Sequence, residues 1–561
     1  MSTESINAEL LTRMFLCGAQ NLEANKAWIN ELNVFPVPDG DTGTNMTMTV
    51  VSAVREVTGL SEHPEMKAIC KAISSGSLRG ARGNSGVILS QLFRGFCKVA
   101  RDNSEVDVKL TADAFDKAVE TAYKAVMKPK EGTILTVAKG AAEKARELAD
   151  GGVTDFAEFL PQVIQYADDV LAKTPEMLPV LKQAGVVDSG GQGLVQFLKG
   201  ALQGFEGKEP DLERILNPDA AAEEEQAPEA AQPELRYGYE ADFVILLDKT
   251  FNQKLENDFR NYLNSIGDHV TVQTRPTAVK VEIQTNDPGL ILQRGLMYGQ
   301  VAGIRIENLR MKDKELPSFT EESGEKKQEQ EEAPAPAPDA PRKSIGIIAV
   351  CAGDGLAEIF RGLGVDMVIQ GGQTMNPSTA DILDAVDKVN ADTVFILPNN
   401  KNIILAANQA AAMDGDKSVV VIPTKTVPQG ITAVINFMPD QDAEANRQNM
   451  VEEISRVKSA EVTYAVRDTV IDDVEIHQGN MMAIGDEGIL EVGEDLNETA
   501  AKALGRMITD DTELVSIYYG AQTSKEDAEA LRSRVCEEHP SCEVELQEGG
   551  QPVYYYILSA E

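Results

Sequence analysis

Cysteine, histidine and basic residues are scarce in this 561-residue sequence, and long apolar runs are missing. The six cysteines are widely scattered, unlike the closely spaced cysteines of a disulfide framework, and this suits a reducing compartment. No run of about 18 apolar residues occurs, so we expect no membrane-spanning helix. The first 20 residues carry Glu4 and Glu9, whereas a signal peptide has a basic start and an apolar centre. These absences predict a cytoplasmic protein.

The shortage of basic residues also argues against nucleic acids and anionic membranes as partners. There are 52 Lys and Arg against 90 Asp and Glu, which gives a formal net charge of −38. Such a surface repels phosphate backbones and anionic lipids, so we expect neither nucleic acid nor a membrane as a partner. Hydrophobic residues still make up 42% of the chain, enough for the cores of about three or four domains.

Two familiar nucleotide motifs are absent from the first 216 residues. Neither Gly-x-x-x-x-Gly-Lys-Ser/Thr nor Gly-x-Gly-x-x-Gly occurs there, which argues against a P-loop or a Rossmann site. A phosphate-binding site in this region must therefore use other glycine-rich turns.

Two low-complexity stretches divide the chain. Residues 217–234 are acidic and rich in alanine and proline, and residues 312–342 are charged and then alternate alanine with proline. Neither has enough apolar side chains to form a core, so both are predicted to be linkers. They separate segments 1–216, 235–311 and 343–561.

The three segments differ in hydrophobic periodicity. The first has helical spacing throughout and few strand signals, and predicts an all-α domain with helices near residues 110–127, 132–149, 154–174 and 191–205. The second has strand and helix signals in the order β-α-β-β-α-β, which predicts a small ferredoxin-like domain. The third alternates short apolar strands with helices, which predicts an α/β domain with a parallel sheet.

The most specific stretch is Asn33–Met46, with the sequence NVFPVPDGDTGTNM. Pro36 and Pro38 exclude a helix before the two aspartates, and Gly40 permits a tight loop. The Thr and Asn side chains that follow can cap a helix. A rigid acidic loop facing a helix N-terminus can hold a hard cation on its carboxylates and phosphate oxygens on the helix amides. The alternative is an ordinary surface turn.

A second glycine-rich turn, Gly80–Gly86, has the sequence GARGNSG and leads into an apolar helix. Asn84 and Ser85 are favourable N-cap residues, and the amides of the first helical turn would point at an anion. This turn is the best candidate for a phosphate cradle. The alternative is a plain cap between two packed helices.

Both turns resemble elements of one known family. The string at 33–46 resembles the signature of the DhaL-like nucleotide-binding domain of dihydroxyacetone kinases, in the variant of the fatty acid kinase A (FakA) family. The turn at 80–86 matches the Gly-Asn-Ser-Gly element of that family. Residues 129–137 and 187–191 match two further family elements in the same order, although each can also be a plain helix start. The resemblance runs across nearly the whole chain and implies a DhaL-like helical barrel, a FakA middle domain and a DegV-like C-terminal domain.

The resemblance implies where ATP and magnesium bind. Asp39 and Asp41 are the expected catalytic carboxylates and would hold two Mg²⁺ ions. DhaL kinases have a third aspartate nearby, where this sequence offers Asn33 as a weaker metal ligand. The residues expected to bind the nucleotide are Thr42, Thr44, Asn45, Gly83, Asn84, Ser85, Gly86, Thr133 and Asp188.

The resemblance also implies a reaction and a partner. In the FakA family, phosphate passes from ATP to the carboxylate of a fatty acid presented by a separate carrier, FakB, of the DegV family. The acyl phosphate then serves phospholipid synthesis. A carboxylate is already an oxyanion nucleophile and needs no general base. The expected partners are this carrier and its fatty acid, in a bacterial cytoplasm, and the middle domain is a candidate for homodimer formation.

The middle segment departs from the FakA pattern. Many FakA sequences have a cysteine and two alternating histidines there, a set that could bind Zn²⁺. This sequence has Glu240, Glu282 and Gln284 at those positions. We therefore expect no zinc in this domain.

Two polar loops of the third segment, residues 371–378 and 398–402, follow predicted strands. They resemble loops of DegV-like proteins, and loops at the ends of strands in open α/β sheets carry binding sites. We expect the face with Asn399 and Asn400 to dock the carrier. A relic of a lipid pocket and simple tight turns are the alternatives.

Two other functions stay open. A dihydroxyacetone-type kinase needs a substrate domain with a carbonyl-capturing histidine, and none of the four histidines lies in a matching segment. An ATP-binding scaffold would have no use for the metal-binding aspartates.

Overall fold

The computed structural model describes residues 3–33, 40–61, 63–126, 128–216, 239–247, 255, 259–260, 263, 267–275, 278–285, 291, 294–295, 298–308, 342–372, 375–413, 415–465, 469–471, 474–486 and 488–561. The chain forms two compact units. One unit comprises Met1–Ala222 together with Glu332–Glu561, and the other comprises Glu223–Glu331. Among the described residues, no helix combines the length and apolarity needed to cross a membrane.

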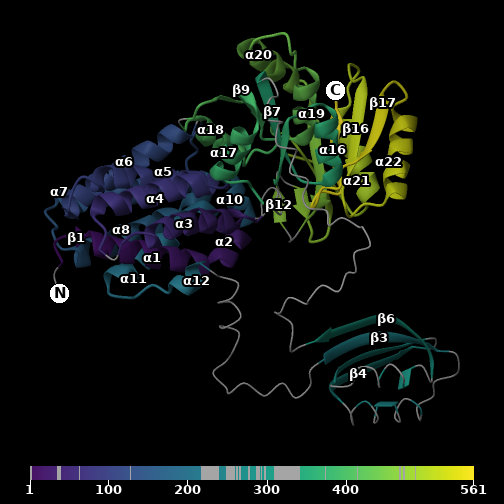
Figure 1. Ribbon diagram of the computed structural model, residues 1–561. Coiled ribbons are helices and arrows are strands. Elements are labelled where there is room, and N and C mark those ends of the chain that lie inside the picture. Colours follow the sequence, from purple (N-terminus) through teal and green to yellow (C-terminus); the bar gives the residue numbers. More distant parts are fainter. Residues whose placement is uncertain are drawn as a thin grey trace. The chain divides into compact units, whose positions relative to one another are not determined.

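The N-terminal part of the first unit is helical, as Figure 1 shows in purple and blue. Its helices are α1 (Ala8–Ala24), α2 (Lys26–Leu32), α3 (Thr42–Thr58), α4 (Met66–Gly80), α5 (Gly83–Ala100), α6 (Val108–Ala125), α7 (Ile134–Asp150), α8 (Phe156–Ala172), α9 (Thr174–Met177), α10 (Pro179–Ala184), α11 (Ser189–Phe205) and α12 (Leu212–Leu216). Two short strands, β1 (Ile6–Asn7) and β2 (Glu105–Val106), pair antiparallel. The four helices predicted after residue 110 are confirmed as α6, α7, α8 and α11.

The longer helices form a closed ring. Each of α1, α3, α4, α5, α6, α7, α8 and α11 contacts the next, and α11 returns to α1. Glycines permit the closest crossings: a Cβ on Gly95 of α5 would lie 2.4 Å from the carbonyl oxygen of Lys117 in α6. A Cβ on Gly200 of α11 would lie 2.4 Å from the carbonyl oxygen of Cys17 in α1. The ring is therefore held by direct packing of helix backbones.

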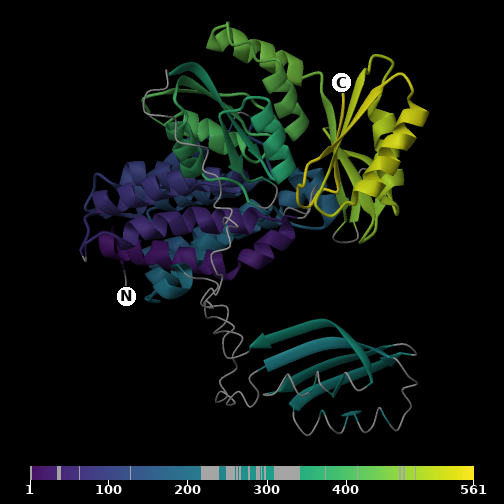
Figure 2. The same ribbon diagram turned by 45° about the vertical axis from the view of Figure 1, so that its right-hand side comes forward.

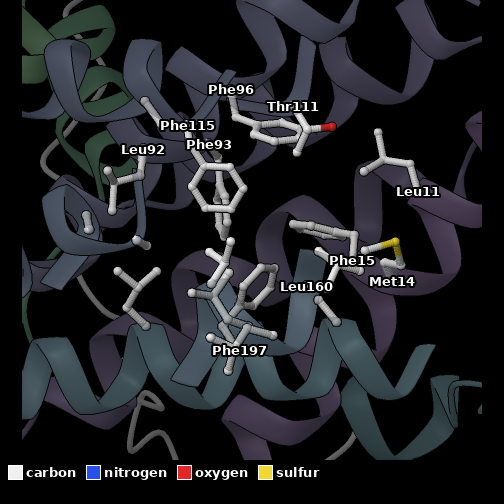
Figure 3. A pocket seen from close by; sticks show the side chains of 18 of the residues that line it. Leu11, Met14, Phe15, Leu92, Phe93, Phe96, Thr111, Phe115, Leu160 and Phe197 are labelled. Atoms are coloured by element: carbon white, nitrogen blue, oxygen red, sulfur yellow. The ribbon is translucent and has the colours of Figure 1, made fainter. Parts of the chain in front are cut away.

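Apolar side chains fill most of the interior of this ring (Figure 3). Phe15, Phe93 and Phe197 form a cluster of rings with centroids 4.9–5.7 Å apart. They border a cavity of about 140 Å³ lined almost entirely by apolar side chains. Burial of this apolar surface is the main source of stability for the ring.

The second unit contains a four-stranded antiparallel sheet. Its strands are β3 (Tyr239–Leu247), β4 (Gly267–Arg275), β5 (Ala278–Thr285) and β6 (Gly299–Asn308), in the order β4-β5-β3-β6. The four predicted strands are confirmed. The two predicted helices fall mostly on residues outside the described ones, so the ferredoxin-like arrangement stays a prediction. The register places Glu240 opposite Gln284 and Asp242 opposite Glu282, so the positions that replace the cysteine and histidine pattern lie on neighbouring strands.

The C-terminal part of the first unit has two sheets, drawn in green and yellow in Figure 2. A parallel sheet has the order β10-β9-β7-β8, with β7 (Lys343–Cys351), β8 (Met367–Gln370), β9 (Ala391–Leu397) and β10 (Ser418–Val421). Around it lie α16 (Asp354–Gly362), α17 (Thr379–Lys388), α18 (Ile404–Ala411), α19 (Val427–Ile435) and α20 (Ala443–Ile454). The expected parallel α/β arrangement is confirmed for this sheet.

The second sheet is mixed and has the order β15-β14-β11-β18-β16-β17. Its strands are β11 (Lys458–Tyr464), β14 (Met481–Gly485), β15 (Ile489–Gly493), β16 (Leu514–Tyr519), β17 (Glu543–Glu548) and β18 (Tyr556–Ala560). The helices α21 (Leu496–Met507) and α22 (Lys525–Glu538) accompany it, and β12 (Thr469–Ile471) pairs with β13 (Val474–Ile476).

Candidate functional site

A cavity of about 350 Å³ lies where the helical domain meets the C-terminal domain. Its walls are mostly polar and come from both domains. The helical domain contributes Asn33, Asp41, Thr42, Asn45, Asn84, Ser85, Ile88, Thr133, Ile134, Asp188, Ser189 and Gly190. The C-terminal domain contributes Asn400, Lys401, Asn402, Lys425, Thr426, Ser459, Ala460, Glu461, Ile484, Gly485, Asp486 and Tyr554.

Four helices begin at this cavity. The first turns or N-caps of α3, α5, α7 and α11 all contribute lining residues. The first amides of a helix lack partners within that helix, and its N-terminus carries a partial positive charge. Four such ends around one polar cavity form a site for a multiply charged anion such as a polyphosphate.

Asp41 is the N-cap residue of α3, but its side chain does not cap the helix. It is only 5% exposed, and Asn376 donates a hydrogen bond from Nδ2 to its Oδ2 over 2.5 Å. Burial raises the pKa of Asp41 to about 6, and hydrogen bonds from Asn45 and Asn376 oppose the shift. A buried carboxylate with few partners is a suitable ligand for a cation.

Asp188 has a structural role in addition to its place in the cavity wall. Its Oδ2 accepts a hydrogen bond from the amide of Gly191 over 2.7 Å, and it also accepts one from the amide of Ile134. It therefore caps both α11 and α7. Burial raises its pKa to about 6, and these two bonds oppose the shift.

Gly83 brings the second turn close to Asp41. Its φ is +56°, a conformation that favours glycine. A Cβ at Gly83 would lie 2.5 Å from Nδ2 of Asn45, the side chain that bonds Asp41. Gly86, one turn later, would place a Cβ 2.3 Å from Oγ1 of Thr49. Both glycines thus lie behind the cavity wall and allow α5 to approach α3.

The structure brings most of the predicted site residues together. Asn33, Asp41, Thr42, Asn45, Asn84, Ser85, Thr133 and Asp188 line the one cavity. Asp39 lies outside the described residues. Thr44 does not line the cavity, and its amide and hydroxyl bond the side chain of Asn30 in α2, so its role in nucleotide binding stays a prediction. The helix also begins earlier than a cap at Thr44 or Asn45 would require.

The second wall comes from residues that the sequence analysis did not assign to the site. Lys401 and Lys425 bring two positive charges to the rim of a cavity that otherwise has acidic side chains. Glu461, Asp486 and Tyr554 come from the mixed sheet and its loops. The loop 398–402 was recognised as a binding loop, but nothing in its local sequence indicated which surface it faces.

Hydrogen bonds join the two walls. Asn84 donates from Nδ2 to Oδ1 of Asn402 over 3.0 Å. Farther from the cavity, Gln91 donates to Oε1 of Gln409 over 2.8 Å, and Gln409 donates to the carbonyl oxygen of Leu78 over 2.7 Å. These bonds tie α4 and α5 to α18.

Docking of a carrier by Asn399 and Asn400 stays a prediction, and the structure shows the contacts that these residues make within the chain. The side chain of Asn399 is buried and donates to the carbonyl oxygen of Val350 over 2.9 Å. Asn400 lines the cavity, and its Oδ1 accepts from the amide of Asn402. This loop therefore faces the helical domain of the same chain. Sequence reasoning placed it on a free surface because the contact joins residues more than 300 positions apart.

Glu461 is the most perturbed carboxylate of the second wall. Burial raises its pKa to about 7, while a hydrogen bond from Tyr554 and the charge of Lys401 oppose the shift and the charge of Asp486 adds to it. The folded protein thus keeps a proton on Glu461 over a pH range in which the unfolded chain has lost it.

We expect Glu461→Gln to remove a pH-dependent loss of stability. Between pH 4.5 and about 7 the folded state binds more protons at this side chain than the unfolded state, so wild-type stability falls as pH rises through this range. At pH 8 the variant should be more stable by at most about 3 kcal/mol. Urea denaturation at pH 5 and pH 8 measures the difference, with Glu543→Gln on exposed β17 as the control. If Glu461→Gln and Glu543→Gln change the free energy of unfolding equally between pH 5 and pH 8, then the pKa of Glu461 is not raised by burial.

The residues present suit a hard cation rather than a soft one. No group of three His, Cys, Asp or Glu that could hold a metal occurs among the described residues. Asp41 and Asn33 nevertheless present oxygen atoms to the cavity, which are the ligands that Mg²⁺ prefers. A magnesium ion that arrives with its nucleotide needs few protein ligands, because phosphates and water complete its shell.

Three family models match successive parts of the chain. They are the DAK2 domain at residues 36–203, the middle domain of the fatty acid kinase A-like (FakA-like) proteins at residues 236–316 and the FakA-like C-terminal domain at residues 346–561. Protein YloV of Bacillus subtilis (strain 168) is 44% identical over 566 residues, which cover 100% of both chains. The chain belongs to the FakA-like family. The domains of this FakA-like chain belong to kinase families, which supports a kinase.

Parts of this FakA-like chain are also similar to solved structures. The dihydroxyacetone kinase from C. freundii, in complex with AMP-PNP and Mg²⁺, is 18% identical over 36% of this chain and 34% of its own, with a TM-score of 0.27. The Fatty Acid Kinase (Fak) B3 protein of Streptococcus pneumoniae, loaded with linoleic acid, is 11% identical over 39% of this chain and 99% of its own, also with a TM-score of 0.27.

Proposed function

We propose that this FakA-like chain is the ATP- and Mg²⁺-dependent component of a fatty acid kinase. It would transfer the γ-phosphoryl group of ATP to the carboxylate of a fatty acid that a FakB/DegV-type carrier presents. The proposal rests on the cavity at which four helices begin, beside the buried carboxylate of Asp41.

The proposed roles follow from charge. The amides that begin α3 and α5 would hold phosphate oxygens, together with the side chains of Asn84 and Ser85. Asp41 would hold a magnesium ion on the β- and γ-phosphates, and Asp39 is proposed to join it. Lys401 and Lys425 approach from the C-terminal domain and would offset the remaining negative charge. Phosphoryl transfer needs little more than this neutralisation and an in-line arrangement.

The character of the cavity supports a carrier-bound acceptor. Ile88, Ile134, Ala460 and Ile484 are the main apolar residues among those that line it. Polar residues make up most of the lining, which does not favour an acyl chain. The carboxylate could enter alone, and the chain would stay in the carrier. An ionised carboxylate also needs no general base, which suits a site where Glu461 is protonated up to about pH 7.

The direct test is phosphoryl transfer from labelled ATP to oleate or palmitate with Mg²⁺, with and without a DegV-family carrier from the same genome. Labelled acyl phosphate is separated from ATP and counted, and hydroxylamine should release its label as inorganic phosphate. We expect product only when both proteins are present. ATP binding without transfer, whichever carrier is supplied, would contradict the proposal.

One observation favours a second candidate, a kinase that acts on a small hydroxyl acceptor. A carboxylate with a pKa of about 7 at the cavity wall, Glu461, has the pKa range of a general base for a hydroxyl group. Dihydroxyacetone in place of the fatty acid, without a carrier, tests this candidate in the same assay. Efficient transfer to dihydroxyacetone would favour it over the fatty acid.

A further inference from the structure

The side chain of Asn376 has an unused buried oxygen beside Asp41. Asn376 lies between β8 and α17 and is 1% exposed. Its Nδ2 donates to Oδ2 of Asp41 over 2.5 Å, but its Oδ1 has no hydrogen-bond partner among the described residues. A buried amide oxygen without a hydrogen-bond partner lowers the stability of the folded state, and such oxygens are rare in native proteins. The nitrogen end of the same amide is the end that faces the carboxylate proposed to hold a cation.

Asn376 is held in place by the turn that carries the proposed phosphate cradle. Arg82 donates from Nη1 to the carbonyl oxygen of Asn376 over 2.8 Å and forms an ion pair with Asp381 in α17 over 3.2 Å. The amide of Thr379 donates to the carbonyl oxygen of Ala81 over 3.1 Å. The start of α17 is thus fastened to the helical domain, and the Asn376 side chain has a fixed origin beside Asp41.

The chemistry of the pair changes when a cation is present. The two ends of the amide differ little in size, so a rotation about its terminal bond would exchange Nδ2 for Oδ1. Without a cation, this exchange would bring Oδ1 of Asn376 close to Oδ2 of Asp41, and the two oxygens would repel each other. Neighbouring oxygens on octahedral Mg²⁺ at about 2.1 Å lie about 3 Å apart, so a cation between them requires a separation only slightly larger than the present 2.5 Å.

We propose that Asn376 supplies its amide oxygen to the divalent cation that Asp41 binds. The cation site is then shared between the helical domain and the C-terminal domain. This inference rests on the proposed metal–nucleotide site and adds a ligand that lies outside the DAK2 match at residues 36–203. Because the cation would bridge the two domains, its binding also strengthens their contact.

The test measures cation affinity rather than catalysis. The full chain is titrated with Mn²⁺ in the presence of ADP, and free Mn²⁺ is followed by its electron paramagnetic resonance signal. Asn376→Leu keeps the branched shape of the side chain but removes the oxygen, and we expect it to weaken Mn²⁺ binding at least about tenfold. Asn376→Asp restores an oxygen and should bind Mn²⁺ at least as tightly as the wild type.

Gln409→Leu is the matched control. Gln409 also joins the two domains through buried hydrogen bonds, but its partners Gln91 and Leu78 do not line the cavity. This variant should bind Mn²⁺ within about twofold of the wild type, although the domain contact is weakened. Thermal denaturation checks that each variant is folded.

The outcomes separate the two proposals. Wild-type affinity in Asn376→Leu would overturn the role of Asn376 and leave the kinase proposal standing. A loss in Asn376→Asp as large as that in Asn376→Leu would show that the amide acts as a hydrogen-bond donor only, and would overturn the role as well. A wild-type chain that binds no Mn²⁺ with ADP would overturn both proposals.

Discussion

Asp41→Asn should lower phosphoryl transfer by at least about a thousandfold without unfolding the protein. The substitution keeps the size of the side chain but removes the negative charge that would hold the metal ion, an effect worth several kcal/mol in the transition state. Transfer from ATP in the presence of carrier and fatty acid measures it. We expect the same direction for Asp39→Asn.

Although Asp41→Asn should lose transfer activity, its thermal stability should be equal to or higher than that of the wild type. Burial disfavours the charged form of Asp41, as its raised pKa indicates, so a neutral amide at this position should leave the melting temperature equal to or above that of the wild type. Loss of transfer with unchanged or raised stability would separate a functional role from a structural one.

Asp107→Asn is the control for this pair of measurements. Asp107 is the N-cap of α6 and its side chain accepts the amide of Leu110, a bond that asparagine can also accept. It does not line the cavity, so transfer should be unaffected. If Asp41→Asn retains transfer like this control, the assignment of the site is wrong.

Local pattern was sufficient to predict the helical domain and one wall of its cavity. Helical periodicity located α6, α7, α8 and α11 because each buries one apolar face, which leaves a repeat in the sequence. Asn84 was found because cap residues and glycine turns are local signals, whereas Asp188 was found through the family resemblance of residues 187–191. Gly95 lies inside α5, where glycine weakens a helix, because α5 and α6 pack backbone to backbone at that residue.

The second wall could not be predicted in the same way. Asn376 and Lys401 meet residues of the helical domain that lie more than 180 positions earlier in the chain, and no local pattern records which surfaces two domains present to each other. The loop 398–402 was recognised as a binding loop, yet it was assigned to an external carrier. The contact of Thr44 with α2 was not predicted either, since the side chain of Asn30 takes up its hydrogen bonds.

The assignment of Asp39 in the acidic loop rests on the sequence motif. Asp39 belongs to the motif that carries the family resemblance, whereas Asp41 and Asn33 on either side of the undescribed stretch both line the cavity. The motif predicts that Asn33 and Asp41 both line the nucleotide site, and both line this cavity. The variants of Asp39 and Asp41 therefore test the motif and the cavity together.

Gly83→Ala should impair nucleotide binding through Asn45 rather than through a direct contact. The new Cβ would lie 2.5 Å from Nδ2 of Asn45, which must then move, and Asn45 bonds the carboxylate of Asp41. We expect affinity for AMP-PNP with Mg²⁺ to fall at least about tenfold and stability to fall by about 2–3 kcal/mol, from backbone strain and overpacking together. Isothermal titration calorimetry and urea denaturation measure the two effects.

Gly152→Ala is the control that has the backbone strain of a positive φ but lacks the steric clash expected in Gly83→Ala. Gly152 also has a positive φ, +85°, but a Cβ there would meet no atom within 4 Å. Alanine should therefore cost about 1 kcal/mol of stability and leave nucleotide affinity unchanged. If Gly83→Ala binds nucleotide as tightly as Gly152→Ala, then the close approach of Gly83 to Asn45 does not position Asp41. If it binds at least about tenfold more weakly, the glycine turn and the acidic loop act as one unit, because the side chain between them is the part that the new methyl group displaces.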